Sequence, residues 1–411
     1  MHGRHIALFP LPGISHVYPF LGLCPELVRR GYRVTVATIQ AAAKHVILAG
    51  AEPVIVATDE YDIPTAEAAI RGLPMNDPKR REEMVSLHSR WLLNSAAIAV
   101  WHLEKFYKEN RPDLVIYELA AYAGRIFAKR FHTPVIQYYP DFIQHSGYAC
   151  WETCVGYNPQ SLVGFSQLLD SVLWAYGFEE PNNFWHIEDL NFYQFPTAFQ
   201  FNSDSIDSRR FCFVGPFLDR PFSPLWKNHS NGKRVILVSA LGGSTDSNYF
   251  NKIADALSGT EYHVILSVGE HFPVSELQTL PINFEINRRA SHLEILPHTH
   301  VHLYSGGPTG TLEGMHFGVP LIAIPSYDRN YIIADHLANL GVVRNLPLHA
   351  LTSRNILENV EAALRDDTFL CRVKQMRHVV RSSGGSVMAV DRIEKFLARS
   401  EERRVGKECV P

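Results

Sequence analysis

Residues 5–38 read HIALFPLPGISHVYPFLGLCPELVRRGYRVTVAT, and this stretch decides the fold. HIALFP and YRVTVAT are apolar runs of strand length, and between them the apolar spacing over residues 17–30 predicts a helix. Pro19 is expected in the first turn of that helix, where no backbone N–H is required, and Gly31 just after its end, where a left-handed residue is favoured. The stretch therefore predicts a strand, a helix and a second, parallel strand.

The same alternation continues along the chain and then starts again. With 411 residues, the chain is too long for one ordinary hydrophobic core. We therefore predict two doubly wound, Rossmann-like α/β domains at residues 1–216 and 233–398, joined by a polar, turn-rich linker at 217–232. Further strands are predicted at Pro53–Ala57, Leu114–Tyr117 and Pro134–Tyr138, and in the second domain at 235–240, His263–Val268, Phe284–Ile286, His302–Tyr304 and Leu321–Ile324.

The composition is that of a globular protein and excludes several classes of partner. Hydrophobic residues make up 46% of the chain, and 39 Lys and Arg balance 42 Asp and Glu without a long basic run, so we expect no nucleic acid partner. No apolar run reaches the roughly 18 residues of a membrane span, and the N-terminus lacks the pattern of a signal peptide. We therefore expect a cytoplasmic protein without a membrane span. The six cysteines are scattered, which favours reduced structural thiols over a zinc site.

The last residues, 399–411, do not resemble a natural protein end. Their sequence, RSEERRVGKECVP, matches the translation of a widely used sequencing adapter. We therefore expect a non-native tail at 399–411 and leave it out of the predicted second domain.

Aromatic side chains crowd an irregular stretch at about 141–201 of the first domain. One interpretation is a helical insertion with its own core. The other is a pocket for a small apolar molecule, because small-molecule sites are mostly lined by apolar and aromatic groups. The sequence favours neither interpretation over the other.

Two polar side chains follow predicted strands of the first domain. His16 follows the first strand, at the entrance of the first helix, and Glu118 follows the strand LVIY. In doubly wound sheets, ligands bind at the carboxyl ends of the strands. A neutral imidazole can take a proton from a hydroxyl near neutral pH, and a carboxylate behind it fixes its tautomer. The pair is a candidate catalytic base, although a histidine in a loop is more often only a turn or capping residue.

In the second domain, a glycine-rich loop links a strand to a helix. Residues 304–314 read YSGGPTGTLEG. Glycines let the backbone approach a diphosphate, and free N–H groups at the start of a helix favour its negative charge. Alone, such a loop is a weak signal, and its value lies in its combination with His16.

Together, these stretches resemble the nucleotide-sugar glycosyltransferases of the macrolide and UDP-glycosyltransferase group. The resemblance runs over nearly the whole chain and implies the GT-B architecture, in which two Rossmann-like domains face each other across a cleft. Besides 5–38, the stretches that carry it are RPDLVIYELAAYAGRIFAKRFHTPVIQ, FVGPF before VILVSALGGS, and HLEIL before YSGGPTGTLEGMHFGVPLIAIPSYDRNYIIAD.

The resemblance implies a role for each matching residue. His16 would be the general base, Glu118 would stand where the family usually has Asp, and Glu313 would bind the donor ribose. The remaining donor-binding positions would be Gly243, Ser244, Arg289, Ala290, Ser305, Gly306, Gly307, Thr309, Gly310, Thr311, Asp328, Arg329 and Asn330. The acceptor-binding positions would be Ile14, Phe142, Tyr148 and Trp151.

Most departures from the family pattern lie in the donor half. Ser305 replaces the usual phosphate-binding His, residues 289–292 (RASH) replace a Trp-Val-Pro-Gln segment, and Arg329-Asn330 replaces Asp-Gln. Asp328 could substitute for that Asp only if the loop shifts. Because a guanidinium can stack on a base and pair with phosphate, we expect Arg289 to supply a cation to the donor, with Arg329 as the alternative.

The resemblance predicts an inverting O-glycosyltransferase for a small hydrophobic acceptor, either a natural product or a xenobiotic. Its co-substrate would be a UDP- or TDP-sugar, with no permanently bound cofactor and no metal. Two other interpretations stay open. One is a non-catalytic relative that binds a partner enzyme or a small ligand, which the altered donor positions suggest. The other is a nucleotide-sugar epimerase of the same fold. A homodimer also stays open.

Overall fold

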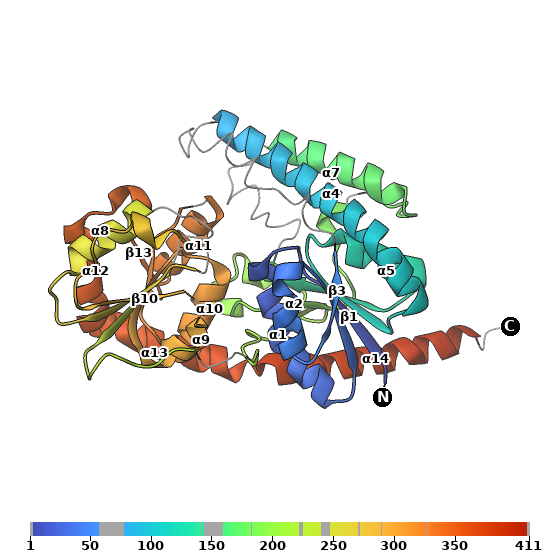
Figure 1. Ribbon diagram of the computed structural model, residues 1–411. Helices are drawn as coiled ribbons and strands as arrows, with labels where there is room; N and C mark the ends of the chain where they lie inside the picture. Colours follow the sequence, from blue (N-terminus) through green and yellow to red (C-terminus); the bar gives the residue numbers. More distant parts are fainter. Residues whose placement is uncertain are drawn as a thin grey trace. The chain divides into compact units, whose positions relative to one another are not determined.

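In the computed structural model the chain forms two compact units, described for residues 3–56, 78–140, 142–143, 159–181, 183–221, 225–239, 247–269, 272–288, 290–326 and 328–408 (Figure 1). The first unit comprises Met1–Pro221 together with Ser383–Pro411, and the second comprises Phe222–Ser382. No helix in the described ranges is long and apolar enough to cross a membrane.

The first unit is built on a parallel sheet of seven strands in the order β3-β2-β1-β4-β5-β6-β7. The strand order reverses between β1 and β4. Doubly wound sheets bind ligands in the crevice at such a reversal, at the carboxyl ends of the strands. The strands are β1 (His5–Phe9), β2 (Arg33–Thr38), β3 (Glu52–Ile55), β4 (Leu114–Glu118), β5 (Val135–Tyr139), β6 (Asn191–Tyr193) and β7 (Phe211–Phe213).

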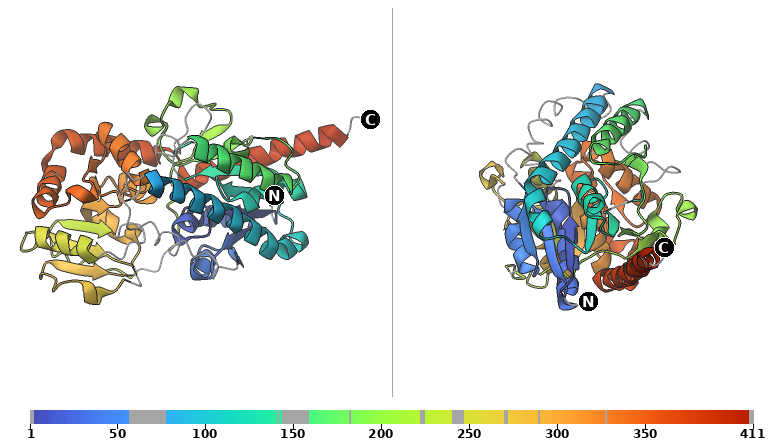
Figure 2. Two further views of the ribbon diagram at one scale, coloured as in Figure 1. Left: turned by 90° about the horizontal axis from the view of Figure 1, so that it is seen from above. Right: turned by 90° about the vertical axis from the view of Figure 1, so that its right-hand side faces the viewer.

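Helices cover both faces of this sheet, because its side chains alternate between two apolar cores. On β1, Ile6 and Leu8 belong to the core under α1, α2 and α14, whereas Ala7 and Phe9 belong to the core under α4, α5 and α7. Figure 2 shows α4 and α7 side by side on this second face, in agreement with their packing contacts. The helices are α1 (Ile14–Arg29), α2 (Ala43–Leu48), α4 (Pro78–Glu109), α5 (Tyr122–Phe131), α7 (Pro159–Trp174) and α14 (Gly385–Glu408).

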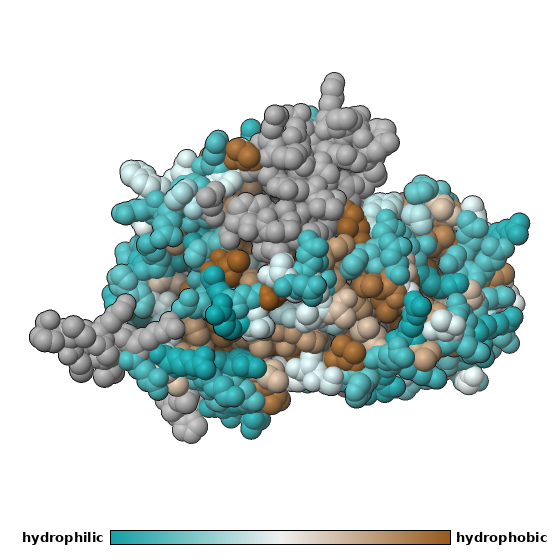
Figure 3. All heavy atoms as spheres, turned by 180° about the vertical axis from the view of Figure 1, so that it is seen from behind, coloured by the Kyte–Doolittle hydropathy of each residue, from teal (hydrophilic) through white to brown (hydrophobic). Residues whose placement is uncertain are grey.

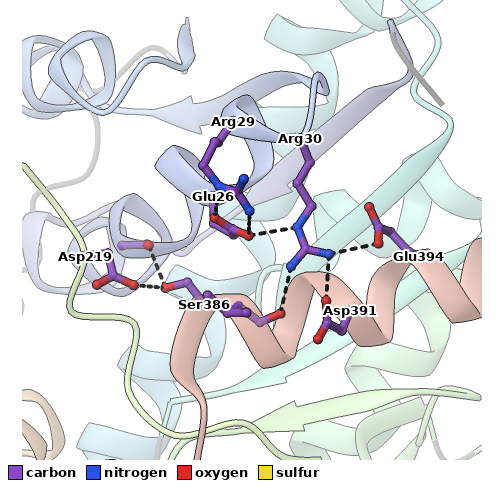
Figure 4. A network of polar contacts seen from close by, with 9 residues as sticks. Glu26, Arg29, Arg30, Asp219, Ser386, Asp391 and Glu394 are labelled. Atoms are coloured by element: carbon purple, nitrogen blue, oxygen red, sulfur yellow. Dashed lines mark hydrogen bonds and ion pairs between the residues drawn. The ribbon is translucent and has the colours of Figure 1, made fainter.

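The last helix, α14, returns to the first unit. Four of its apolar side chains pack into the core beside α1: Ala389, Val390, Ile393 and Leu397. Ser386 Oγ lies 2.9 Å from the carbonyl of Gly22 and 2.8 Å from Asp219 Oδ2 (Figure 4). The structure therefore ends the second unit at Ser382, whereas the sequence had predicted that this domain extends to 398.

Charged groups reinforce the contact between α14 and α1. Arg30 Nη1 lies 2.7 Å from Asp391 Oδ1 and 2.9 Å from Glu394 Oε2, and Arg30 Nε lies 2.8 Å from Glu26 Oε1 (Figure 4). Arg29 and Arg30, which both contact the Glu26 carboxylate, lower the pKa of Glu26 to about 2.

The helix α1 also passes close to the backbone of Phe217. A Cβ at Gly22 would lie 2.1 Å from the Phe217 carbonyl oxygen, so only glycine fits there.

The second unit repeats the plan with six parallel strands in the order β10-β9-β8-β11-β12-β13, and its order reverses between β8 and β11. Its strands are β8 (Val235–Ser239), β9 (His263–Ser267), β10 (Phe284–Asn287), β11 (Thr299–Tyr304), β12 (Leu321–Ala323) and β13 (Arg344–Asn345). Its helices are α8 (Ser247–Leu257), α9 (His292–Ile295), α10 (Pro308–Phe317), α11 (Asp328–Asn339), α12 (Ser353–Arg365) and α13 (Asp367–Ser382).

The two predicted doubly wound sheets and their first strands are confirmed, but some details differ. The helix α1 begins at Ile14, so Pro19 lies in its second turn and not in the first. Gly31 follows the helix with a φ of 85°, as predicted. The segment at 141–201 is no separate insertion in its described parts, because it supplies α7 and β6 to the first unit.

The predicted tail continues α14 to Glu408, and Glu401 in it pairs with Arg4. Its non-native origin stays a prediction.

On the face drawn in Figure 3, hydrophilic side chains dominate and hydrophobic ones gather in separate patches. This distribution fits a chain whose apolar side chains mostly pack in the cores of the two units.

Candidate functional site

The structure brings His16 and Glu118 into contact. His16 lies in the first turn of α1, directly after β1, and Glu118 is the last residue of β4. These are the two strands at which the strand order of the first sheet reverses. His16 Nδ1 lies 2.6 Å from Glu118 Oε1, as the sequence predicted for a base and its carboxylate.

Both oxygens of Glu118 accept a hydrogen bond. Besides the contact with His16, the backbone N–H of Leu11 donates to Glu118 Oε2 at 2.9 Å. Glu118 is buried, whereas 31% of the His16 side chain is exposed. Because a carboxylate only accepts, it holds the His16 proton on Nδ1 and leaves the lone pair of Nε2 available. The arrangement can take a proton from a molecule at the carboxyl edge of the sheet.

An apolar pocket, open in part to solvent, lies beside this pair. It is formed at the carboxyl ends of β1, β2 and β4 by the segments that follow β1 and β4, and by α4. Its lining residues are Phe9, Pro10, Leu11, Pro12, Ala37, Thr38, Val56, Ser95, Ala96, Ala99, Ala120, Ala121, Tyr122 and Ala123. The sequence reasoning missed this pocket, because six of its fourteen lining residues are alanines, which carry no chemical signal of their own.

Neither Ile14 nor Phe142, the two predicted acceptor residues that the structure describes, is among the residues that line this pocket. Phe142 is fully buried, with its ring 5.2 Å from the ring of Phe195 and 5.0 Å from that of Phe201. The structure therefore corrects the prediction for Phe142, which packs in an aromatic core. Ile14 is exposed at the start of α1, two residues before His16, and stays a candidate. Tyr148 and Trp151 lie outside the described residues.

In the second unit, the glycine-rich loop joins β11 to α10, as the sequence predicted. Gly306 has a φ of 77°, which favours glycine, and Gly307 is the residue that precedes α10. A Cβ at Gly310 would lie 2.9 Å from the Tyr304 ring, so glycine is needed there for close packing. Ser305, Gly307 and Thr309 are partly exposed at this helix start, where backbone N–H groups and the helix dipole favour an anion.

Thr311 holds the loop together and does not face a ligand. It is fully buried, and its hydroxyl donates to the carbonyl of Gly307 at 2.9 Å. The hydroxyl of Tyr304 lies 2.7 Å from the same Thr311 oxygen. The structure therefore corrects the predicted contact between the Thr311 hydroxyl and a diphosphate, because this hydroxyl is already used inside the loop.

Asn330 reaches the same loop from α11. Its Nδ2 donates to the carbonyl of Ser305 at 2.8 Å. Sequence reasoning placed Asn330 among the residues that contact the donor, and the structure shows it supporting the backbone of the glycine-rich loop. Asp328 and Arg329 precede it in α11, and their side chains lie outside the description, as do Gly243, Ser244 and Arg289 altogether.

Polar side chains gather at the carboxyl ends of the neighbouring strands. His292 Nε2 lies 3.0 Å from Ser267 Oγ, and His292 Nδ1 lies 4.0 Å from Glu313 Oε2. Glu313 is buried on α10. Ser291 caps α9 by accepting from the backbone N–H of Leu293 at 3.2 Å. Ala290 closes the preceding turn through two hydrogen bonds with the side chain of Asn287.

A buried histidine, which the sequence analysis had not singled out, lies beneath this cluster. His302, in β11, is fully buried, and its Nε2 lies 2.6 Å from Ser239 Oγ. Its ring packs edge-on against that of His292 at 5.6 Å. Burial lowers the pKa of His302 well below the usual value for histidine, so the imidazole is neutral near neutral pH.

Comparison with known proteins agrees with this arrangement. Residues 185–381 match the family described as UDP-glucoronosyl and UDP-glucosyl transferase. The chain is 30% identical over 410 residues to NDP-glycosyltransferase YjiC of Bacillus subtilis (strain 168), covering 97% of this chain and 99% of that protein. It is 28% identical to oleandomycin glycosyltransferase of Streptomyces antibioticus, covering 97% of this chain and 92% of that protein.

A solved structure shows the same fold. The calicheamicin glycosyltransferase CalG4 superposes with a TM-score of 0.80 at 28% identity, covering 97% of this chain and all of that one. The relatives described here are all glycosyltransferases, and they give no support to a non-catalytic binding protein or an epimerase. With its two parallel-sheet α/β units of the GT-B type, the chain belongs to the nucleotide-sugar glycosyltransferases of the macrolide and UDP-glycosyltransferase group.

Proposed function

We propose that this glycosyltransferase is an inverting enzyme that moves a sugar from a UDP- or TDP-sugar to a hydroxyl of a small, largely apolar acceptor. The observation that carries the proposal is the 2.6 Å contact between His16 Nδ1 and Glu118 Oε1, next to an apolar pocket lined by the segments that follow β1 and β4. A base next to an apolar pocket suits an acceptor that presents a hydroxyl on a hydrophobic body.

In this mechanism, Nε2 of His16 accepts the proton of the acceptor hydroxyl while the acceptor oxygen forms a bond to the anomeric carbon. The bond from that carbon to the diphosphate oxygen breaks in the same step, and the nucleoside diphosphate leaves with the electron pair. A single in-line displacement inverts the configuration at this carbon. Glu118 stabilises the imidazolium that forms, because its Oε1 lies 2.6 Å from Nδ1.

We assign the donor to the second unit. The start of α10, with the backbone N–H groups after Gly306, would receive the diphosphate, and the Ser305 hydroxyl would donate to it in place of the family's histidine. Glu313 would accept hydrogen bonds from the ribose hydroxyls. Arg289 would oppose the developing negative charge, so that no metal is needed for the departure of the diphosphate.

Incubation with UDP-glucose or TDP-glucose and a panel of phenols tests the proposal. Release of nucleoside diphosphate that depends on the phenol would show transfer, and the anomeric coupling constant of the product by NMR would give its configuration. We expect a β-glucoside from an α-linked donor. An α-glucoside would refute inversion, and binding of UDP without turnover on any acceptor would favour the non-catalytic interpretation.

The role of His16 needs its own variant. His16→Ala should lower kcat by roughly a hundredfold or more, the usual size of a general-base contribution. His102→Ala, at an exposed position of α4 in the same unit, is the matched control and should keep the wild-type rate. An unchanged rate in His16→Ala with an unchanged melting temperature would remove His16 from the mechanism.

A further inference from the structure

A tight turn precedes β8, the first strand of the second unit along the chain. Residues 230–233 read SNGK, and the backbone N–H of Lys233 donates to the carbonyl of Ser230 at 2.9 Å. Between them, Asn231 and Gly232 have φ values of 51° and 83°. Two consecutive left-handed residues inside such a hydrogen bond form a type I′ turn, in which Asn-Gly is the preferred pair. This is the only Asn-Gly pair in the sequence.

Both residues of this pair are open to their surroundings. Asn231 and Gly232 are exposed, and a Cβ added at Gly232 would meet no atom within 4 Å. Within the described part of the chain, neither the side-chain amide of Asn231 nor the backbone N–H of Gly232 has a hydrogen-bond partner. A single backbone hydrogen bond closes the turn, so its local opening costs far less free energy than global unfolding.

An open Asn-Gly pair can react with itself. The backbone nitrogen of Gly232 attacks the side-chain Cγ of Asn231, since glycine has no side chain that hinders the approach. The new bond from nitrogen to Cγ closes a five-membered succinimide ring. The side-chain nitrogen leaves as ammonia, with the electron pair of its bond to Cγ and the proton of the Gly232 N–H. Water then opens the ring at either carbonyl carbon and gives aspartate or isoaspartate, in which the main chain runs through the side-chain carbons.

Two glutamates hold the segment just before the turn onto the second unit. Glu294 Oε1 accepts from the backbone N–H groups of Leu225 and Trp226 at 2.8 and 3.2 Å. Glu285 Oε1 accepts from Trp226 Nε1 at 2.9 Å, and Glu285 Oε2 lies 3.3 Å from His229 Nδ1. Isoaspartate would add one methylene to the main chain between this segment and β8. Because β8 is fixed between β9 and β11, the turn and the exposed His229 have to take up the extra length.

We propose that Asn231-Gly232 is a site of spontaneous deamidation, and that its isoaspartate product loosens the segment that leads into β8. The reaction consumes only water and releases ammonia. It needs neither the nucleotide sugar nor the acceptor, so the inference does not depend on the proposed function.

Peptide mass spectrometry, after incubation of the folded protein in mildly alkaline buffer, tests the site. Residue 231 should gain the mass that separates a hydroxyl from an amino group, and an isoaspartyl methyltransferase should methylate the product. Asn228 is the control in the same segment, because the larger His229 follows it and its Oδ1 accepts from Ser230 N–H at 3.0 Å. That hydrogen bond alone should make Asn228 at least about fivefold slower.

Asn231→Gln is the matched variant for this experiment. It keeps the amide, but its longer side chain would have to close a six-membered ring, so it should gain no mass over the same period. Equal conversion at 228 and 231, or no conversion at 231 while circular dichroism shows that the protein is folded, would overturn the site.

Hydrogen exchange tests the consequence for the neighbouring segment. In aged protein enriched in isoaspartate, the backbone amides of 225–233 should exchange at least about fivefold faster than in fresh protein, the effect of losing one hydrogen bond. Freshly purified Asn231→Asp carries the charge without the extra methylene and should exchange at the wild-type rate. Unchanged exchange in the aged protein would refute the loosening, and fast exchange in Asn231→Asp would contradict its origin in main-chain length.

Discussion

Glu118→Gln is the most informative single change in the catalytic pair, because it keeps the shape of the side chain and removes one acceptor. In the wild type, one carboxylate oxygen accepts from Leu11 N–H at 2.9 Å and the other contacts His16 Nδ1 at 2.6 Å. An amide has only one oxygen, so its NH₂ group must face one of these two nitrogens. If the oxygen stays on Leu11, the NH₂ group faces His16 and pushes its proton to Nε2.

That tautomer cannot act as a base, because its Nε2 no longer carries a lone pair. The loss should therefore approach that of a missing general base, about 10² to 10⁴ in kcat, with roughly a hundredfold as the minimum. KM for the donor should change little, since Glu118 lies in the first unit and the donor is assigned to the second. Release of UDP in a coupled assay, at saturating donor and phenol, measures kcat directly.

Two companion variants sharpen this result. Glu118→Asp keeps both acceptor oxygens but shortens the side chain by about 1.5 Å, so it cannot hold both contacts and should fall between the wild type and Glu118→Gln. The double variant of Glu118→Gln with His16→Ala should be no slower than His16→Ala alone, because Glu118 acts through His16. A double variant whose loss equals the product of the two single losses would refute this coupling.

Three further outcomes are expected. Asn330→Ala should weaken UDP binding about fivefold in calorimetry, because it removes the hydrogen bond to the Ser305 carbonyl that supports the glycine-rich loop; an unchanged affinity would contradict that support. Arg289→Ala should weaken UDP and TDP binding more than about tenfold, while EDTA leaves activity intact; activity that disappears with EDTA and returns with magnesium would refute metal independence. Burial lowers the pKa of His5 and His302, so these histidines take up protons at a higher pH in the unfolded chain than in the folded one. The free energy of unfolding should therefore fall as the pH drops below about 6.5, the usual pKa of histidine. Urea titrations between pH 8 and 5 measure this, and a free energy of unfolding that stays constant over this range would contradict it.

Local patterns were sufficient to predict the sheets. The strands and the helix α1 in 5–38 follow from apolar spacing and from Gly31, and the alternation along the chain predicts parallel strands. The positions of His16 and Glu118 after adjacent strands predicted their contact, because the carboxyl ends of parallel strands share one edge. Such inferences use only the chain's local order and the known handedness of its connections.

Inferences that needed the direction of a side chain failed more often. Phe142 and Thr311 lie in the expected segments, but both side chains point into the interior. Sequence position cannot distinguish a buried aromatic from one that lines a pocket, and a hydroxyl in a loop is as suitable for bonding the loop as for bonding a ligand. The pocket was missed for the opposite reason, because small side chains such as Ala96 and Ala99 give no sequence signal of the space that they line.

The return of α14 could not be read from the chain either. Its apolar face is visible in the sequence as Ala389, Val390, Ile393 and Leu397, but this pattern does not say which sheet it covers. Which sheet the helix covers depends on residues far away in the sequence that pack and pair with it. Arg30, on α1, meets Asp391 and Glu394 only because the chain passes back to the first unit.

The serine at 305, where the family pattern predicts a histidine, leaves the shape of the loop itself intact. Three features set the shape of this loop: the left-handed conformation of Gly306, the close packing of Gly310 on Tyr304, and the bond from Asn330 to the Ser305 carbonyl. None of them involves the side chain at 305. Backbone N–H groups at the start of α10 therefore remain in position for a diphosphate, whichever side chain stands there. The altered side chains of the second unit therefore leave intact the backbone on which the proposed donor site depends.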